Sequence, residues 1–305
     1  MTWVGVVLLV GSLISPQTSL AATYDSHLPV KPIKGSESRQ INLMLFDAAA
    51  KGQTEEVKSL LAEGASVEAR DRFGNTALLL AALSGKHHTV QALLDAGSAV
   101  NHQNLIGSTA IYRAAKNHRR RSVKALLAAG ANINLPNKKG LTPLLASAYN
   151  GNGRLVDLFL GQGADPTAMD SYGKTAVVYA AGRGFHDIVA TLLNTGIDVN
   201  KRYGNDLTVL MWAAGFSNDV PAKEGERTVR MLLKRGANVG LRDNRGWSAL
   251  TTAAYRDHGG IIRLLIAAGA NPNVRSKQGK TPLDIARAAR SHKAAGVLTG
   301  QSANE

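Results

Sequence analysis

The residue types that usually carry catalysis or bind metals are few in this chain, and their spacing fits neither role. Cysteine is absent, which excludes disulfides, thiolate metal sites and a cysteine nucleophile. The histidines do not stand four residues apart around a glutamate, the arrangement that places two ligands on one face of a zinc-binding helix. We interpret six of them as exposed loop residues. These six are His87, His88, His118, His186, His258 and His292.

The glycine-rich motifs of nucleotide and hydrolase sites are also missing. The sequence holds no G-x-S-x-G elbow, no Walker-type loop and no dinucleotide-binding fingerprint. Paired carboxylates are too few to nominate a general acid and a general base. We therefore predict no catalytic residue, no metal and no cofactor, and a protein that is not an enzyme. A histidine–carboxylate pair in a deep cleft would revive the enzymatic alternative.

Glycine marks a period in this sequence. The residue recurs at the same place in successive copies, 33 residues apart, with one step of 40 residues before Gly236. The series is Gly64, Gly97, Gly130, Gly163, Gly196, Gly236 and Gly269. A fixed period in this range is the signature of stacked structural repeats, so the chain is predicted to form one elongated array.

Each copy has the same internal pattern, which residues 75–101 show well. A Gly-x-Thr or Gly-x-Ser sequence opens a first helix, where the hydroxyl can cap the helix and glycine permits a positive φ. A second helix follows with a Val/Ile-x-x-Leu-Leu ridge, as in Val90, Leu93 and Leu94. Proline stands just inside two of the first helices, at Pro143 and Pro282, where it costs no hydrogen bond.

These residues resemble ankyrin repeats. Thr142-Pro143-Leu144 and Thr281-Pro282-Leu283 match the T-P-L-H-x-A pattern most closely, and Gly130 to Asn134 matches the closing loop. The resemblance covers residues 41–298 and implies an all-α solenoid of helix-turn-helix repeats with β-hairpin loops. It implies an N-terminal cap plus seven repeats, with an insertion at 217–226, and we expect a monomer.

The sequence departs from the family pattern in two further ways. The histidine after the leucine is absent from every copy, so its hydrogen bonds to the turn must be replaced or lost. Asp206 takes the position of a turn glycine, which is expected to distort that hairpin. The first copy lacks the hairpin of the later ones, as a terminal capping repeat should.

The N-terminus has the pattern of an export signal. Trp3 to Ile14 is uncharged and apolar but too short to span a bilayer. Pro16 and the small residues Ser19 and Ala21 follow, which predicts a signal peptide over 1–21, cleaved after Ala21, with Ala22 as the next-best site. No basic residue precedes the apolar run, so an uncleaved anchor or a buried helix is the alternative. Residues 22–40 are predicted to be a flexible leader and 299–305 a polar tail; we expect a bacterial protein, periplasmic or secreted.

The charge is strongly positive. The chain has 36 basic and 22 acidic residues, for a net charge of +14. Residues 1–21 contain none of these charges, so cleavage would leave the excess intact. Such a charge favours acidic proteins, anionic polymers or anionic membrane surfaces as partners.

The family resemblance implies that hairpin tips and the far ends of the first helices line a concave face that binds other proteins. The corresponding positions here are mostly basic or aromatic, a composition that dominates interface energetics. They are Arg72, Phe73, Lys138, Lys139, Tyr149, Tyr172, Lys174, Arg183, Arg202, Phe216, Arg242, Arg245, Trp247, Tyr255 and Arg256. The acids among them are Asp71, Asp170 and Asp243, each at the first position of a turn, where aspartate bonds the local backbone.

Two hypotheses of binding follow. The first is a non-catalytic scaffold that binds an acidic protein along this face, with the 217–226 insertion as an extra contact. The alternative is an anionic polymer or membrane surface in the cell envelope, contacted through Arg119, Arg120 and Arg121. These three cations stand at the start of a second helix, where the helix dipole disfavours them. Nucleic acid is disfavoured only if the protein is exported.

Overall fold

A computed structural model describes residues 36–218 and 220–300. The predicted signal peptide, most of the predicted leader and most of the predicted tail lie outside the described residues. Within them the chain forms helix pairs joined by tight turns. The first helices of the pairs are α1 (Ser36–Lys51), α3 (Ala77–Ser84), α5 (Ala110–Lys116), α7 (Pro143–Tyr149), α9 (Ala176–Gly182), α11 (Val209–Ala214), α13 (Ala249–Tyr255) and α15 (Pro282–Ala288). The second helices are α2 (Thr54–Ala62), α4 (His87–Asp95), α6 (Arg120–Ala128), α8 (Gly153–Gly161), α10 (His186–Leu193), α12 (Ala222–Lys234), α14 (Gly259–Ala267) and α16 (His292–Leu298).

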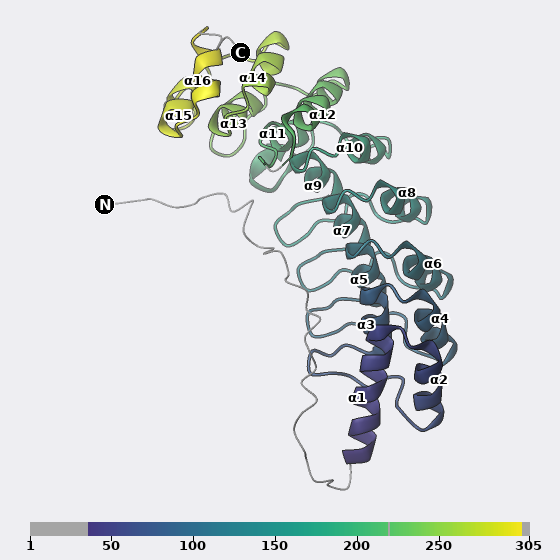
Figure 1. Cartoon of the computed structure of the whole chain (residues 1–305). Helices are drawn as coiled ribbons and strands as arrows, with labels where there is room; N and C mark the ends of the chain where they lie inside the picture. The colour runs from purple at the N-terminus through teal and green to yellow at the C-terminus, as the bar shows by residue number, and fades with distance from the viewer. Residues whose placement is uncertain (1–35, 219, 301–305) are drawn as a thin grey trace.

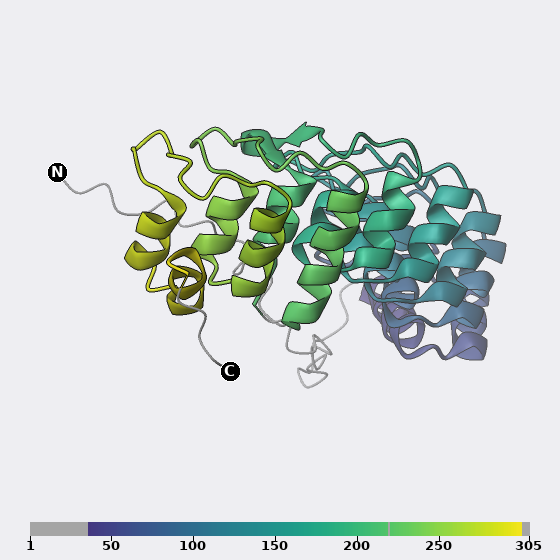
Figure 2. The same cartoon turned by 90° about the horizontal axis from the view of Figure 1, so that it is seen from above.

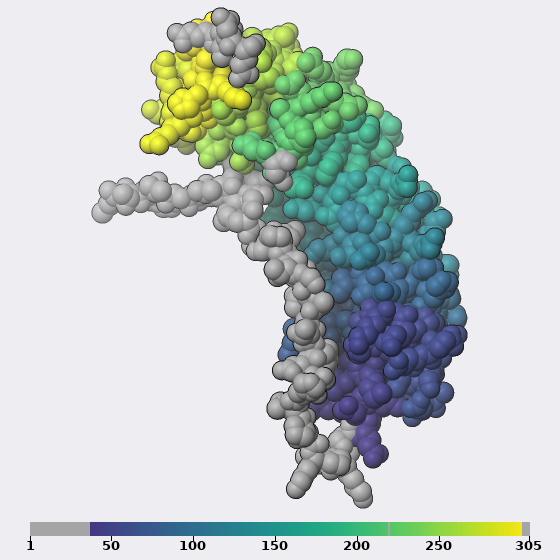
Figure 3. Space-filling view, viewed as in Figure 1, coloured from purple at the N-terminus to yellow at the C-terminus, as the bar shows by residue number. Residues whose placement is uncertain are grey.

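The pairs stack into a curved solenoid, which confirms the predicted all-α fold. Each odd-numbered helix packs against the next odd-numbered one, and the even-numbered helices form a parallel second row. The odd-numbered helices and the long loops before them lie on the inner side of the arc, and the even-numbered helices lie on the outer side (Figure 1). Seen from above, the loops gather along one edge of the stack (Figure 2). The space-filling view shows the arc from the purple α1 end to the yellow α16 end (Figure 3).

Small side chains on the inner helices let the layers approach closely. The paired alanines of α3, Ala81 and Ala82, are fully buried, and the same holds for the alanine pairs of α5, α9, α11 and α13. Larger buried residues come from both rows, among them Leu78 and Leu79 of α3 and Phe159 of α8. The core is therefore one continuous hydrophobic layer along the array, and each repeat buries its apolar surface against its neighbours.

The hairpin tips are the turns of the long loops that precede the inner helices, numbered here from the one before α3. Most of them are built around one side-chain acceptor. The Oδ1 atom of Asp71 accepts hydrogen bonds from the backbone N–H groups of Phe73 and Asn75, both at 2.8 Å. Asp170 and Asp243 do the same in their own tips. The local role predicted for these three aspartates is confirmed.

Neighbouring tips are joined through the backbone. The N–H of Leu105 donates to the carbonyl of Phe73 at 3.0 Å, and the N–H of Lys138 donates to that of Ile106 at 3.1 Å. The contact recurs from Ser171 to the carbonyl of Lys139 at 2.9 Å. The tips therefore form a ladder that fixes the spacing of side chains along the inner face.

The fifth tip differs, as the aspartate at its glycine position predicts. Here β1 (Arg202–Tyr203) pairs antiparallel with β2 (Leu207–Thr208), and a 3-10 turn, η1 (Gly204–Asp206), connects them. Asn205 and Asp206 both have φ near +60°. Aspartate and asparagine tolerate this left-handed region better than most residues, so the hairpin closes without a glycine at position 206.

The predicted helix caps are mostly confirmed. Thr109, Thr142, Ser248 and Thr281 each accept a hydrogen bond from the backbone N–H three residues later. Thr76 and Thr175 do not, so the prediction is wrong for those two helices. In the last repeat the position of the missing family histidine is filled by Asp284. Its carboxylate accepts from the N–H and hydroxyl of Thr281 at 2.9 and 2.8 Å, which replaces the lost bonds.

One predicted boundary needs correction. Helix α1 begins at Ser36, so residues 36–40 are helical although they were predicted to belong to the flexible leader. The 217–226 insertion is partly helical, because its second half lies in α12, which has 13 residues; its use as an extra partner contact stays a prediction. Its first half packs inward: the N–H of Ser217 donates to the carbonyl of Gly182 at 3.0 Å, and Val220 lies close to Gly184.

His258 is partly buried beneath the same insertion. The imidazole ring of His258 stacks on Phe216 with centroids 4.1 Å apart. Nδ1 lies 2.9 Å from the carbonyl oxygen of Ala214, and Nε2 lies 2.7 Å from Oδ1 of Asn218. The prediction of exposed loop histidines is therefore wrong for His258. It is also wrong for His87 and His186, because α4 and α10 begin at these residues and their exposure is intermediate.

His258 makes stability depend on pH. Burial lowers the pKa of His258 below its ordinary value, and Arg256 acts in the same direction, while Ala214 and Asp257 oppose it. The unfolded chain therefore binds more protons than the fold once the pH falls below about 6.5, so stability decreases there. We expect a drop in the free energy of unfolding between pH 7.5 and 5.5, with a slope of at most about 1.4 kcal/mol per pH unit.

Urea unfolding at several pH values measures this effect. His258→Gln serves as the comparison, because glutamine does not titrate. The variant should lose part of the slope whatever its absolute stability. An unchanged slope would show that His258 does not carry the pH dependence.

Membrane and metal features are absent from the described ranges. In residues 36–218 and 220–300 no helix combines the length and apolarity that crossing a bilayer requires. Over the same ranges, histidine, aspartate and glutamate side chains do not gather in groups of three or more that could hold a metal ion.

Candidate partner-binding face

The structure places almost all predicted contact residues on the tips or inner helices, with at least partial exposure. Phe73 and Tyr172 are the most exposed of the aromatics, at 54% and 58%. Phe216 is the exception, because it is only 2% exposed and packs against Gly225 of α12. The prediction of Phe216 as a contact residue is wrong, since the insertion covers it.

Two of the predicted arginines donate hydrogen bonds to backbone carbonyls of the hairpin loops. Nη1 of Arg202 donates to the carbonyl of Arg242 at 2.8 Å. Arg242 in turn donates from Nε to the carbonyl of Gly246 at 3.1 Å and from Nη2 to the carbonyl of Arg275. These guanidiniums join successive loops and satisfy backbone acceptors. Their charge adds to the face, but much of their hydrogen-bonding capacity is already used.

Cations and aromatic rings alternate along the rest of the face. The guanidinium carbon of Arg183 lies 5.3 Å from the ring centroid of Tyr149, and that of Arg256 lies 5.8 Å from Tyr255. Arg72 lies 4.8 Å from Phe73 on the first tip. These distances fall within the range of cation–π attraction. Every cation–aromatic pair found in the described ranges belongs to a tip or an inner helix.

Lys174 is at the centre of the largest such group. Its Nζ lies 5.6 Å from the ring of Tyr179 and 4.9 Å from that of Trp212. The hydroxyl of Tyr179 donates to the buried carboxylate of Asp170. Tyr179 also meets Tyr149 edge to face, with centroids 5.4 Å apart. One network therefore links α7, α9, α11 and the fourth tip.

The acids of this face are occupied within the fold. Asp71, Asp170 and Asp243 accept backbone hydrogen bonds in their tips, and the last two also bind the hydroxyl of Tyr179 and the guanidinium of Arg245. Their oxygens are therefore directed at the protein. Asp206 of the fifth tip is exposed, and the other outward-facing charges of the tips and inner helices are mostly cations.

Two lysines of this face have lowered pKa values, because of burial and, for one of them, repulsion by neighbouring cations. Desolvation lowers the pKa of Lys116, and the nearby charges of Arg113 and Lys139 lower it further. Burial also lowers the pKa of Lys174, although Asp170 offsets part of this effect. For Tyr179, burial raises the pKa first and the hydrogen bond to Asp170 raises it further, so the phenol stays protonated. Holding these cations close together costs electrostatic free energy in the isolated protein. An anionic partner would stabilise the cluster.

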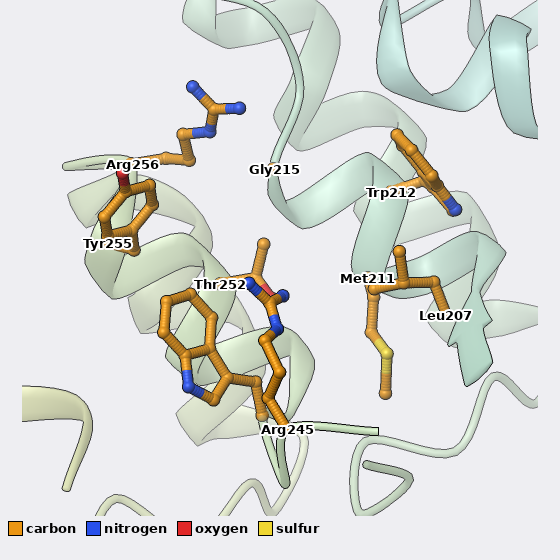
Figure 4. Close-up of a pocket in the computed structure, with 9 residues that line it drawn as sticks. Leu207, Met211, Trp212, Gly215, Arg245, Thr252, Tyr255 and Arg256 are labelled. Carbon is orange, nitrogen blue, oxygen red and sulfur yellow. The ribbon is translucent and has the colours of Figure 1, made fainter. Parts of the chain in front are cut away.

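A hollow opens on this face between α11 and α13. It has a volume of about 380 Å³ including the part open to solvent. Met211 and Trp212 form one side, Tyr255 and Arg256 lie across from them, and Arg245 stands between (Figure 4). We call it the α11–α13 hollow. Its lining is Leu207, Met211, Trp212, Gly215, Arg245, Trp247, Thr252, Tyr255 and Arg256.

Comparison with known proteins agrees with this architecture. The family model described as "Ankyrin repeats (3 copies)" matches residues 45–137, 112–203, 144–221 and 210–304, which together cover most of the chain. The chain belongs to the ankyrin-repeat family. Ankyrin repeats generally mediate protein–protein interactions and are generally not catalytic.

Individual relatives match only parts of this ankyrin-repeat chain. It is 40% identical over 57 residues to human Ankyrin repeat domain-containing protein 63, which covers 19% of this chain and 15% of that protein. Identity to human Rabankyrin-5 is 38% over 74 residues, 24% of this chain and 6% of that protein. A Putative ankyrin repeat-containing protein of Treponema pallidum is 37% identical over 84 residues, 27% of this chain and 28% of that one. The matches thus span less than a third of each relative's length.

Sequence reasoning missed several residues of the ankyrin inner face. Tyr179 and Trp212 were overlooked because they stand within first helices, one residue before an alanine pair that marks the core. Leu105 and Ile106 were missed because only basic and aromatic tip residues were considered. Both are more than half exposed, at 61% and 58%. An apolar pair at a turn tip was the available signal.

The outer row of the ankyrin array has its own cations. The Arg119 side chain packs over Gly85 and its Nε donates to the carbonyl of Leu83 at 3.4 Å, and the residue remains exposed. Arg119 therefore has contacts within the fold, and its role as an anion contact stays a prediction. Arg120 and Arg121 are exposed.

Proposed function

We propose that this ankyrin-repeat protein is a non-catalytic scaffold that binds an acidic protein through its inner face. The observation that carries the proposal is the alternation of cations and aromatic rings on that face, with the neighbouring acids occupied internally. Arginine, tyrosine and tryptophan dominate the energetics of protein interfaces. The positive field would also speed the approach of an acidic partner.

We further propose that the protein is exported to the periplasm or secreted from a bacterium and acts there as a monomer. The support is the apolar run at 3–14 followed by Ser19 and Ala21. N-terminal sequencing of the mature protein would test export directly. A mature chain that begins at Ala22 supports the proposal, and one that retains Met1 or Thr2 overturns it.

Charge reversal at the centre of the inner face tests the binding function. Lys116, Lys138 and Lys139 lie near one another and make no ion pair among the described residues. Changing all three to glutamate should weaken capture of partner proteins from an envelope fraction by about tenfold or more, because attraction becomes repulsion. Quantitative mass spectrometry of the captured proteins, repeated at rising salt, measures the loss.

A matched triple variant on the outer row is the control. Arg120→Glu, Lys124→Glu and Arg154→Glu change the net charge equally, and all three residues are exposed on α6 and α8. This variant should capture the same proteins as the wild type. If both triples lose them equally, the total charge and not the inner face determines binding. Loss only in the outer triple would favour the anionic polymer or membrane surface, and no loss in the inner triple would overturn the proposal.

A further inference from the structure

The α11–α13 hollow is held in shape by a buried carboxylate. Oδ2 of Asp243 accepts from Nε and Nη2 of Arg245 at 2.9 and 2.7 Å, and the Asp243 side chain is fully buried. Its Oδ1 accepts from the backbone N–H groups of Arg245 and Trp247. One residue therefore holds the guanidinium of Arg245 and the backbone of Trp247. These parts of the hollow are held in place before any ligand binds, which lowers the entropy cost of binding.

The geometry of this pair leaves an apolar floor. The guanidinium carbon of Arg245 lies 4.0 Å from the ring centroid of Trp247, so its charge is covered by the ring on one side and paired with Asp243 on the other. The ring of Trp247 lies 5.5 Å from that of Tyr255. Met211 is almost fully buried at the base. A small apolar side chain would meet sulfur, aromatic and methyl groups here.

A free positive charge lies at the rim. Arg256 lines the hollow and lies beside the ring of Tyr255, and its guanidinium has no hydrogen bond or ion pair within residues 36–218 and 220–300. Since Arg245 and Asp243 neutralise each other, Arg256 gives the hollow its net positive charge. Lys174 adds a second cation behind the other wall, 4.9 Å from the ring of Trp212.

We infer that the α11–α13 hollow anchors a partner segment in which an apolar side chain lies next to a carboxylate. The apolar side chain enters between Trp212 and Trp247, and the carboxylate pairs with Arg256. The inference rests on the proposed function and deepens it, because it names the part of an acidic partner that the face selects. The partner segment is extended, so that one residue can reach the apolar floor while its neighbour reaches Arg256 at the rim.

The chain supplies its own reporter. Its sequence has three tryptophans, and two of them, Trp212 and Trp247, line the hollow. In the full chain with Trp3→Phe, tryptophan fluorescence therefore reports on the hollow alone. The probes are three capped decapeptides that differ only at their centre, with Glu-Leu-Glu, Glu-Ser-Glu or Gln-Leu-Gln.

The Glu-Leu-Glu peptide should shift the emission and bind about tenfold more tightly than either of the others, a difference of about 1.4 kcal/mol. Arg256→Gln should remove most of the preference for Glu-Leu-Glu over Gln-Leu-Gln and keep the preference for leucine over serine. Arg120→Gln on the outer row should change neither. Equal binding of the three peptides, or a charge preference that survives Arg256→Gln, would overturn the inference.

The two proposals fail in different ways. If Arg256→Gln captures partners as the wild type does while the Lys116, Lys138 and Lys139 triple loses them, the face binds proteins and the hollow is not the anchor. If the peptides bind in the hollow while the triple captures partners unchanged, the hollow is a site and the proposed use of the whole face is wrong.

Discussion

Gly140→Ala is expected to destabilise the array by about 2–5 kcal/mol. Gly140 has φ of +75°, a conformation that costs an L-residue roughly 1–2 kcal/mol. An added Cβ would also lie 2.8 Å from Cα of Asp170 and 3.0 Å from the carbonyl oxygen of Met169. These are backbone atoms that cannot rotate away, so the collision adds about 1–3 kcal/mol. Urea unfolding followed by circular dichroism measures the change.

Gly130→Ala is the matched control. Gly130 has almost the same φ, +80°, and an added Cβ there would meet no atom within 4 Å. It should cost only the conformational part, about 1–2 kcal/mol. Equal losses in the two variants would mean that the close approach of neighbouring tips does not constrain Gly140.

The collision at Gly140 has a functional consequence. The hydrogen bond from the N–H of Ser171 to the carbonyl of Lys139 joins the third and fourth tips beside it. Pushing these tips apart would separate Lys139 from Tyr172 on the inner face. Gly140→Ala should therefore weaken partner capture more than Gly130→Ala does, even where both variants remain folded.

Phe159→Ala is expected to cost about 3–5 kcal/mol, the range for truncating a fully buried aromatic side chain. Phe159 is completely buried in α8, near the middle of the array. Stability in a stacked repeat protein is close to a sum of repeat and interface contributions. A weak central repeat should therefore let the two halves unfold separately, and the single unfolding transition should split or broaden.

Scanning calorimetry and urea unfolding would show this splitting. Phe73→Ala removes the same atoms from an exposed tip and should cost less than about 1 kcal/mol, in one unchanged transition. A comparable loss in the two variants would contradict the burial difference on which the prediction depends.

The sequence by itself determined the repeat, its period and the local chemistry of each copy. The spacing of glycines fixed the helix pairs, and the aspartates at the first turn position could be assigned their backbone bonds. The distorted hairpin at Asp206 was predictable as well. All of these depend on residues close together in the chain, where backbone geometry leaves few choices.

Only the tertiary structure decided which side chains of the inner face are available. Phe216 is covered by an insertion whose packing on Gly182 and His258 no local pattern reveals. Arg202 and Arg242 donate to carbonyls of neighbouring loops, although long flexible side chains could equally have pointed into solvent. The hollow joins Trp212 of α11 to Trp247 and Arg256 of the next repeat. Such contacts depend on how one copy sits against another, and a period in sequence does not specify that distance.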